Sequence, residues 1–219
     1  MSMMRLISPV VPTLLPTDTA DKALAIMEDN RLSDLPVVQD DNYIGTVRER
    51  EIEDWADHDK ELSSADLSIF RPAILSSAHP LEAVRLFAHY EVDVLPLIDF
   101  DQKYLGAITK DSLLKYIAET SSLDTPGAII VLEIKPHNYS LYQIARLFEN
   151  EDVSILSSQI HTLADGTMEL TIKTNRTATD AVTSSLERHE YKVKEVFGDQ
   201  KNMEDVMDKY ALLMNYLNM

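Results

Sequence analysis

The alternation of apolar and polar residues divides the first half of the chain into two similar segments. Each segment has two short apolar runs, rich in Val and Ile, with a polar stretch between them. The runs occupy residues 35–38 and 43–47 in the first segment, and residues 95–98 and 104–108 in the second. Short apolar runs flanked by polar turns are typical of buried strands rather than helices. Each segment therefore predicts a β-hairpin.

A helix is expected ahead of each hairpin, because apolar residues recur there at helical spacing. Thr19 suits the N-cap of the first helix, and Pro80 suits the first position of the second. The predicted inner faces are Ala20, Ala23, Leu24 and Met27 in the first helix, and Ala83, Val84, Phe87 and Ala88 in the second.

Further helices are expected to start after each hairpin, at residues 48–55 and 110–117. The second of these has an apolar face that we expect to point inward, formed by Leu113, Leu114 and Ile117. Residues 4–15 are apolar but are interrupted by prolines, which predicts a short helical turn and an edge strand rather than one long element.

The two segments match residue by residue, which indicates an internal repeat. The offset is 60 residues through the helix and 61 after the hairpin turn, so that Ala23 matches Ala83 and Gly45 matches Gly106. Solenoids need about three or more repeats to bury a continuous core. Two copies therefore predict a pair of halves that face each other.

The order of these elements resembles a known family. Strand, helix, Leu-Pro-apolar-apolar, hairpin, Gly-x-apolar-x-x-x and helix occur twice within residues 3–120, which resembles a tandem pair of cystathionine-β-synthase (CBS) domains, the Bateman module. The resemblance implies one repeat at residues 1–62 and a second at residues 63–122, related by a pseudo-twofold axis. It also implies regulatory binding of an adenine nucleotide, such as AMP, ADP or ATP, in the clefts between the repeats.

Residues 121–127 mark a boundary, after which the apolar pattern changes. Strands are expected at residues 128–134, 153–163, 168–173 and 191–197. Ser140 and Gln143 form a capping box that opens a helix with Ile144, Leu147 and Phe148 on its apolar face. With a second helix at residues 178–189, the order is βαββαβ, which is the split-βαβ, ferredoxin-like plan.

Behind a CBS pair, this arrangement over residues 127–199 resembles an ACT domain, a small-molecule regulatory module that commonly pairs across a dimer. The combination resembles the acetoin-utilisation accessory proteins. In such domains the first strand-to-helix loop carries an Asp and a Gly that let the backbone approach an amino acid. Here that loop provides His137, Asn138 and Tyr139. Tyr139 stands near the expected glycine, so the loop has either a ligand or a packing and dimerisation role.

The end of the chain predicts one more helix, at residues 202–218. Its apolar residues recur at helical spacing, and acidic residues stand near its start, where they complement the helix dipole. We expect this amphipathic helix to pack either on the CBS pair or on another subunit. The predicted fold class is therefore α/β (α+β): a tandem CBS pair, a ferredoxin-like ACT-like domain and a C-terminal helix.

Composition narrows the classes of partner. The net charge is −17, with no cluster of Lys and Arg, so nucleic acids and anionic membranes are unsuitable partners. The chain has no Cys, which excludes disulfides, thiolate catalysis and Cys-based zinc sites. It has neither an N-terminal signal-peptide pattern nor an apolar run of 18 residues, so we expect a cytoplasmic protein.

The resemblance also points to candidate ligand-binding residues. In nucleotide-binding CBS repeats the strand after the glycine ends in Thr or Ser, and an Asp three residues later holds the ribose hydroxyls, because a carboxylate can accept two hydrogen bonds from a vicinal diol. Neither copy has the full pair. The candidates at or near these positions are Arg48 and Glu51 in the first copy, and Thr109, Asp111 and Ser112 in the second, with Arg71 as a further cation for phosphate.

No catalytic signature is present. The sequence lacks a Gly-x-Ser-x-Gly elbow, a phosphate loop and a His-Glu-x-x-His pair, and its histidines are scattered. We interpret residues 57–59, Asp-His-Asp, as an exposed acidic linker rather than a metal site, because adjacent side chains on a loop are not preorganised as ligands. The chain is expected to be a non-enzyme.

Two main functional hypotheses remain, and a third, an unrecognised hydrolase, would require a pocket with convergent titratable groups. The first is a regulatory homodimer in which the CBS pair binds an adenine nucleotide or related metabolite and acts on an unidentified protein. The second is a degenerate CBS pair that serves as a structural dimerisation or adaptor module without a ligand.

Overall fold

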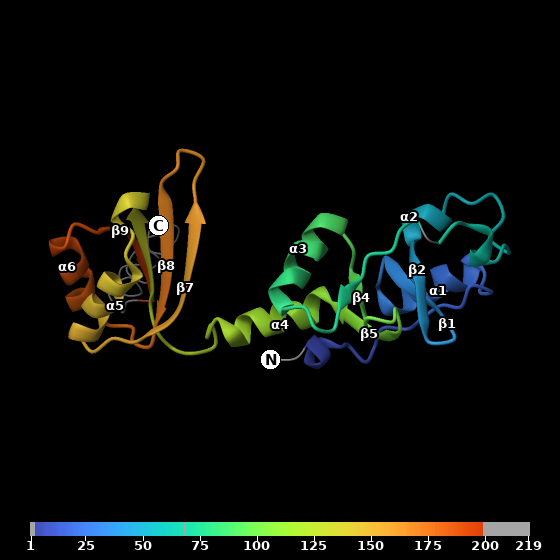
Figure 1. Cartoon of the computed structure of the whole chain (residues 1–219), viewed down its shortest axis with the longest axis horizontal. Coiled ribbons are helices and arrows are strands. Elements are labelled where there is room, and N and C mark those ends of the chain that lie inside the picture. Colours follow the sequence, from blue (N-terminus) through green and yellow to red (C-terminus); the bar gives the residue numbers. More distant parts are fainter. Residues whose placement is uncertain (1–2, 68, 199–219) are drawn as a thin grey trace, which may run out of the picture. The chain divides into compact units, whose positions relative to one another are not determined.

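The computed structural model describes residues 3–67 and 69–198, which form two units, Met1–Ile117 and Ala118–Met219 (Figure 1). The predicted C-terminal helix at residues 202–218 lies outside the described residues. The helices of the CBS-like region are α1 (Ala20–Asn30), α2 (Glu49–Ile52), α3 (Pro80–Tyr90) and α4 (Lys110–Thr120), and its strands are β1 (Asp34–Gln39), β2 (Asn42–Arg48), β3 (Ile74–Leu75), β4 (Val94–Ile98) and β5 (Tyr104–Thr109).

Both predicted hairpins are confirmed. Strand β1 pairs antiparallel with β2, and β4 pairs antiparallel with β5. The two registers agree, since Val37 lies opposite Gly45 and Leu97 lies opposite Gly106. Both hairpins also shift register at the next residue, so the copies share even this irregularity.

The helices that precede the hairpins begin and end as two copies of one design. The Thr19 hydroxyl accepts a hydrogen bond from the backbone N–H of Lys22 at 3.3 Å, and Pro80 opens α3, as predicted. Each helix ends at a residue in the left-handed conformation, Arg31 with φ 54° and Glu91 with φ 55°.

The apolar faces are narrower than predicted. Ala23, Met27, Ala83 and Phe87 are buried as expected. The inward placement of Val84, Ala88 and Leu114 was wrong, because all three are exposed, Leu114 by 66%. Successive residues on a helix are turned by about 100° (3.6 residues per turn), so a neighbour of the buried Ala83 or Leu113 lies on the flank of the helix.

The two repeats exchange their N-terminal segments. Met3 and Leu6 lie in a single turn of 3₁₀ helix, Met3–Leu6, and pack in the core of the second repeat. Leu67, which stands near the start of the second repeat in the sequence, packs in return against the core of the first. Residues 4–15 do contain the predicted helical turn, but the edge strand was wrong: Ile7 and Leu14 form only isolated bridges.

A quasi-symmetric set of hydrogen bonds also joins the repeats. The buried carboxylate of Asp34 accepts the backbone N–H groups of Asp93 at 2.6 Å and Val94 at 3.0 Å. In return, the carboxylate of Asp93 accepts hydrogen bonds from the hydroxyl and the backbone N–H of Ser33. The start of each hairpin is therefore capped by the other repeat.

The second unit has the predicted βαββαβ order. Its strands are β6 (Ile129–Ile134), β7 (Ile155–Thr162), β8 (Met168–Thr174) and β9 (Lys192–Phe197), and its helices are α5 (Leu141–Asn150) and α6 (Asp180–Arg188). The strands form one antiparallel sheet in the order β7-β8-β6-β9. Ser140 caps α5 by accepting the N–H of Gln143 at 3.4 Å, and Ile144, Leu147 and Phe148 are buried, as predicted.

None of the helices within residues 3–67 and 69–198 is long and apolar enough to cross a lipid bilayer.

Candidate functional site

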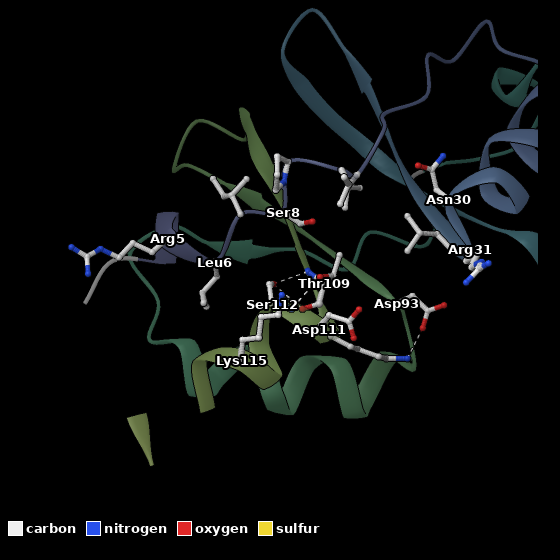
Figure 2. A pocket seen from close by; sticks show the side chains of 16 residues that line it. Arg5, Leu6, Ser8, Asn30, Arg31, Asp93, Thr109, Asp111, Ser112 and Lys115 are labelled. Carbon is white, nitrogen blue, oxygen red and sulfur yellow. Dashed lines mark hydrogen bonds and ion pairs between the residues drawn. The ribbon is translucent and has the colours of Figure 1, made fainter. Parts of the chain in front are cut away.

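A cavity of about 650 Å³ opens between the two repeats. One side is formed by residues 5–11, which cross from the first repeat to the second, and by Asn30, Arg31 and Leu32 at the end of α1. The other side is formed by Asp93 and by residues 109–112 and 115 at the start of α4. We call this cavity the first cleft (Figure 2).

The start of α4 provides polar groups to the first cleft. Thr109 and Ser112 form a reciprocal capping box, in which each side-chain oxygen accepts the backbone N–H of the other residue at 3.2 Å. The Ser112 hydroxyl donates to the carbonyl oxygen of Thr109 at 2.9 Å. Thr109 Oγ1 acts as an acceptor in this box, so its own proton can be donated to a ligand. The N-terminus of a helix also carries partial positive charge, which favours an anion.

Basic side chains surround this helix start. Arg5, Arg31, Lys110 and Lys115 all line the first cleft, although the protein as a whole has a net charge of −17. In Figure 2, Arg31 and Lys115 lie on opposite sides of the Thr109–Ser112 pair, whereas Arg5 points away from it. Asp93 and Asp111 also line the first cleft, but its cationic side chains outnumber them, in a protein that is acidic as a whole.

Lys110 connects the first cleft to the junction between the repeats. Its ammonium group lies 2.6 Å from the carboxylate of Asp93, which also contacts Ser33. Burial of Asp93 opposes its ionisation, but the hydrogen bonds from Lys110 and Ser33 and the charge of Lys110 outweigh burial, so the pKa of Asp93 is lowered. Asp93 is thus held as a carboxylate at the wall of the cleft.

The matching place in the first repeat holds a smaller cavity, of about 210 Å³, which we call the second cleft. Part of its lining corresponds to that of the first cleft: Glu51 takes the place of Ser112, Leu67 that of Ile7, and Phe70 that of Val10. Trp55 lies in the same wall. The two clefts therefore lie at equivalent positions in the two repeats.

Arg48 lies outside the lining of the second cleft but contacts two residues of its wall. Its guanidinium group forms an ion pair with Glu51, and its Cζ lies 3.9 Å from the centre of the Phe70 ring. Phe70 in turn meets the Tyr90 ring edge to face at 5.9 Å. Within the described residues, the buried Nε of Arg48 has no hydrogen-bond partner.

The structure divides the candidate ligand-binding residues between different places. Thr109, Asp111 and Ser112 come together in the first cleft, whereas Arg48 and Glu51 are paired at the second. Arg71 lies in the wall of neither cavity. Its guanidinium donates hydrogen bonds to the carbonyl of Tyr43 at 2.8 Å and to Gln102 at 3.4 Å.

The first strand-to-helix loop of the second unit, which provides candidate residues 137–139, is partly packed against the core of that unit. Residues 136–138 form a single 3₁₀ turn, Asn138 is exposed, and Tyr139 packs against the core of the second unit. The side chain of His137 lies outside the described part. The position of Tyr139 agrees with a packing role for this loop.

Sequence reasoning missed Arg31, Lys115 and Arg5. Arg31 follows α1 in a left-handed conformation, and Arg5 belongs to the segment that crosses to the other repeat. Neither position carries a local motif. Lys115 could have been found, because it follows Asp111 by four residues and Ser112 by three, on neighbouring turns of the same helix.

Within the described ranges, no group of three or more His, Asp or Glu side chains is arranged to hold a metal ion.

Comparison with known proteins finds a family model that matches part of this chain. The family model for the CBS domain matches residues 4–57 and 71–119. Inosine-5'-monophosphate dehydrogenase of Methanocaldococcus jannaschii is 26% identical over 159 residues, which cover 70% of this chain and 31% of the relative. The chain thus spans less than a third of that relative's length.

Two solved structures are among those that match this chain. Protein MJ1004 from Methanocaldococcus jannaschii is 17% identical with a TM-score of 0.50, and the match covers 70% of each chain. A CBS domain pair/ACT domain protein from Thermotoga maritima is 19% identical with a TM-score of 0.48, and the match covers 54% of this chain and 98% of that one.

Proposed function

Because residues 4–119 hold a tandem pair of CBS domains, we propose that the protein is a regulatory sensor that binds an adenine nucleotide or a related phosphorylated metabolite in the first cleft. In this proposal the second unit is an ACT-like regulatory domain, the functional form is a homodimer, and the protein carries out no catalysis itself. The regulated partner is another protein.

The cationic first cleft carries the proposal. Its volume of about 650 Å³ falls within the roughly 300–1,000 Å³ of small-molecule sites. A buried phosphate needs cationic partners, and Arg31, Lys110 and Lys115 surround the start of α4. An overall charge of −17 gives no general reason for cations to gather there, which supports a specific anion.

The geometry suggests a role for each group. A phosphate would lie at the N-terminus of α4, where it accepts hydrogen bonds from backbone N–H groups and from the Thr109 hydroxyl. Arg31 and Lys115 would neutralise it from opposite sides (Figure 2). Asp111 is exposed beside them and would accept hydrogen bonds from the ribose hydroxyls.

Calorimetry with AMP, ADP and ATP tests this function. We expect heat of binding and a thermal shift with at least one of them. The double variant Arg31→Gln, Lys115→Gln should weaken binding tenfold or more, which is about 1.4 kcal/mol. Lys60→Gln is the matched control, since Lys60 is exposed and lies outside the walls of both cavities, and it should leave affinity unchanged. The absence of heat and of a thermal shift with every adenine nucleotide would contradict the proposal.

Regulation also requires that the ligand bind two arrangements of the protein with different affinities. Lys110 is placed for this role, because a phosphate in the first cleft competes with Asp93 for its ammonium group. Asp93 also contacts Ser33 of the other repeat. Ligand binding would thus change the contacts at the junction.

A structural dimerisation or adaptor role is the second candidate, favoured by apolar side chains left exposed on two helices. Leu81 and Val84 of α3 are 59% and 38% exposed, and Leu114 of α4 is 66% exposed. Sedimentation of the double variant Val84→Arg, Leu114→Arg tests it. A lower mass with unchanged folding assigns this surface to assembly, and an unchanged mass removes the support for the role.

A further inference from the structure

The two clefts lie at matching places in the two repeats but differ in volume, and the position of Arg48 offers a reason for the difference. We propose that the Arg48 side chain closes the second cleft, so that each chain binds one ligand and not two. The count of one ligand rests on the function proposed above, whereas the closure itself rests only on the geometry of the second cleft.

The first argument is size. The second cleft has a volume of about 210 Å³, against about 650 Å³ for the first. Only the larger value reaches the roughly 300 Å³ at which small-molecule sites begin. Tyr90, Glu91 and Val92 match Asn30, Arg31 and Leu32 of the first cleft but do not line the second, so the second cleft lacks that side. Phe70, on which Arg48 lies, contacts Tyr90 of that side.

The second argument is the position of the guanidinium group. Its carbon lies 3.9 Å from the centre of the Phe70 ring, which is the distance of a planar group stacked on an aromatic face. A nucleobase would stack on the same face of Phe70. Arg48 therefore covers the face of Phe70 on which a planar ligand could stack.

The third argument is charge. Among the described residues that line the second cleft there is no Lys or Arg, while Glu51 and Asp66 both line it. The ion pair holds Glu51 to Arg48 and keeps the guanidinium in place. A phosphate entering here would meet the carboxylates of Glu51 and Asp66, and the Arg48 guanidinium beside the cleft is already paired with Glu51, so the second cleft disfavours an anionic ligand.

The second copy shows what the open arrangement requires. At the positions that match Arg48 and Glu51, it has Thr109 and Ser112, whose short side chains bond to each other's backbone and leave the cleft clear. The position that matches Phe70 is Val10, which is 71% exposed. Replacing the long charged pair with the short polar pair should therefore open the second cleft.

Trp55 allows a test that reads the second cleft alone. It lines the second cleft and is the single Trp of the chain. The test titrates adenosine and ATP into the wild type and into the double variant Arg48→Thr, Glu51→Ser, following Trp emission and, separately, heat. We expect no change of Trp55 emission in the wild type and a saturable change with adenosine in the variant. By heat, the variant should bind one more adenosine per chain than the wild type does.

The matched control is Arg50→Thr, Glu53→Ser. It removes the same charges from the same stretch, and both side chains are exposed outside the second cleft, so Trp55 emission should stay silent. Circular dichroism checks folding. If the double variant does not fold, Arg48→Ala alone serves, with the same expected gain.

The outcomes separate this inference from the proposed function. If the wild type shows no heat but the variant gains a Trp55 response, the closure stands and the nucleotide function of the first cleft fails. If wild-type Trp55 emission itself titrates, and still does so in Arg31→Gln, Lys115→Gln, the second cleft is open and the inference is overturned. It is equally overturned if the folded variant, or folded Arg48→Ala in its place, gains no response.

Discussion

Gly45 and Gly106 occupy the same place in the two hairpins, and each lies under the N-terminal segment that comes from the other repeat. A Cβ atom on Gly45 would lie 2.0 Å from the backbone oxygen of Leu67. A Cβ atom on Gly106 would lie 2.7 Å from the side chain of Ile7, and Gly106 has φ +143°. The repeated glycine therefore reflects the close approach of the exchanged segments.

Alanine at these glycines should destabilise the first unit in a defined order. Gly45→Ala should cost the most, roughly 3 kcal/mol or more, because a backbone atom must move. Gly106→Ala should cost roughly 1–3 kcal/mol, since a side chain can yield but the backbone angle is strained. Urea unfolding measures both. Gly166→Ala, in the second unit, is the comparison and is followed on the unfolding of that unit: its Cβ would meet nothing within 4 Å, and only the φ of +83° should cost about 1 kcal/mol. Equal losses at all three would contradict this account.

Asp34 should give the first unit a distinctive pH dependence. Burial raises the pKa of Asp34 from 3.8 to about 6, although the N–H groups of Asp93 and Val94 act in the opposite direction. The folded state then holds the proton more tightly than the unfolded chain. The stabilising contribution of the Asp34 carboxyl group is complete below pH 3.8 and is lost as the pH rises through about 6.

An NMR titration of the Asp34 carboxyl carbon should have a midpoint near pH 6. In Asp34→Asn, the unfolding free energy should lose the part of its slope that the wild type shows between about pH 4 and 6. Asp93 lies next to this group but has a lowered pKa, so its slope has the opposite sign, and Asp93→Asn provides the comparison. An Asp34 midpoint below pH 4.5 would show that the two N–H groups outweigh burial.

At the level of elements, the sequence pattern correctly predicted the features that depend on neighbouring residues. The hairpins, the caps at Thr19 and Ser140, and the βαββαβ order followed from apolar period and turn residues. The exchange that brings Leu6 to the second repeat could not be predicted, because it depends on which of two similar cores a segment enters. For the same reason Arg5, which lies on the exchanged segment, could not be placed in the first cleft, whereas Thr109 and Ser112 stand at positions that the repeat and the family resemblance mark.

The start of α4 offers a test at this scale, because its capping box serves both the helix and the cleft. Thr109→Ala removes the acceptor for the Ser112 N–H and should cost about 1 kcal/mol. Thr109→Ser keeps an equivalent hydroxyl and should cost less than about 0.5 kcal/mol. Urea unfolding gives the energies, and amide exchange in the first turn of α4 locates the change. If the two variants lose the same stability, the methyl group of Thr109 and not its hydroxyl stabilises this turn.

At the scale of the whole molecule, the chain has separate hydrophobic cores. Two clusters belong to the two repeats of Met1–Ile117, and a third lies in the second unit, where the sheet and α5 and α6 surround Phe148. Contacts that hold one core together do not contribute to another, so a single free energy of unfolding does not describe such a chain. The two units should therefore unfold as distinguishable steps.

Phe148→Ala tests this separation, because Phe148 is 1% exposed in the core of the second unit. Replacing a buried Phe by Ala costs roughly 3–5 kcal/mol, and each kcal/mol lowers the melting point of a domain of about 100 residues by roughly 4–8 °C. Calorimetry should show the transition of the second unit falling by more than 10 °C, while that of Met1–Ile117 stays in place and still rises with a bound nucleotide. Tyr142→Ala is the control on the same helix, because Tyr142 is 74% exposed and should shift neither transition. A common fall of both transitions in Phe148→Ala would mean that the two units unfold cooperatively. Ligand binding to the first unit would then stabilise the second unit as well.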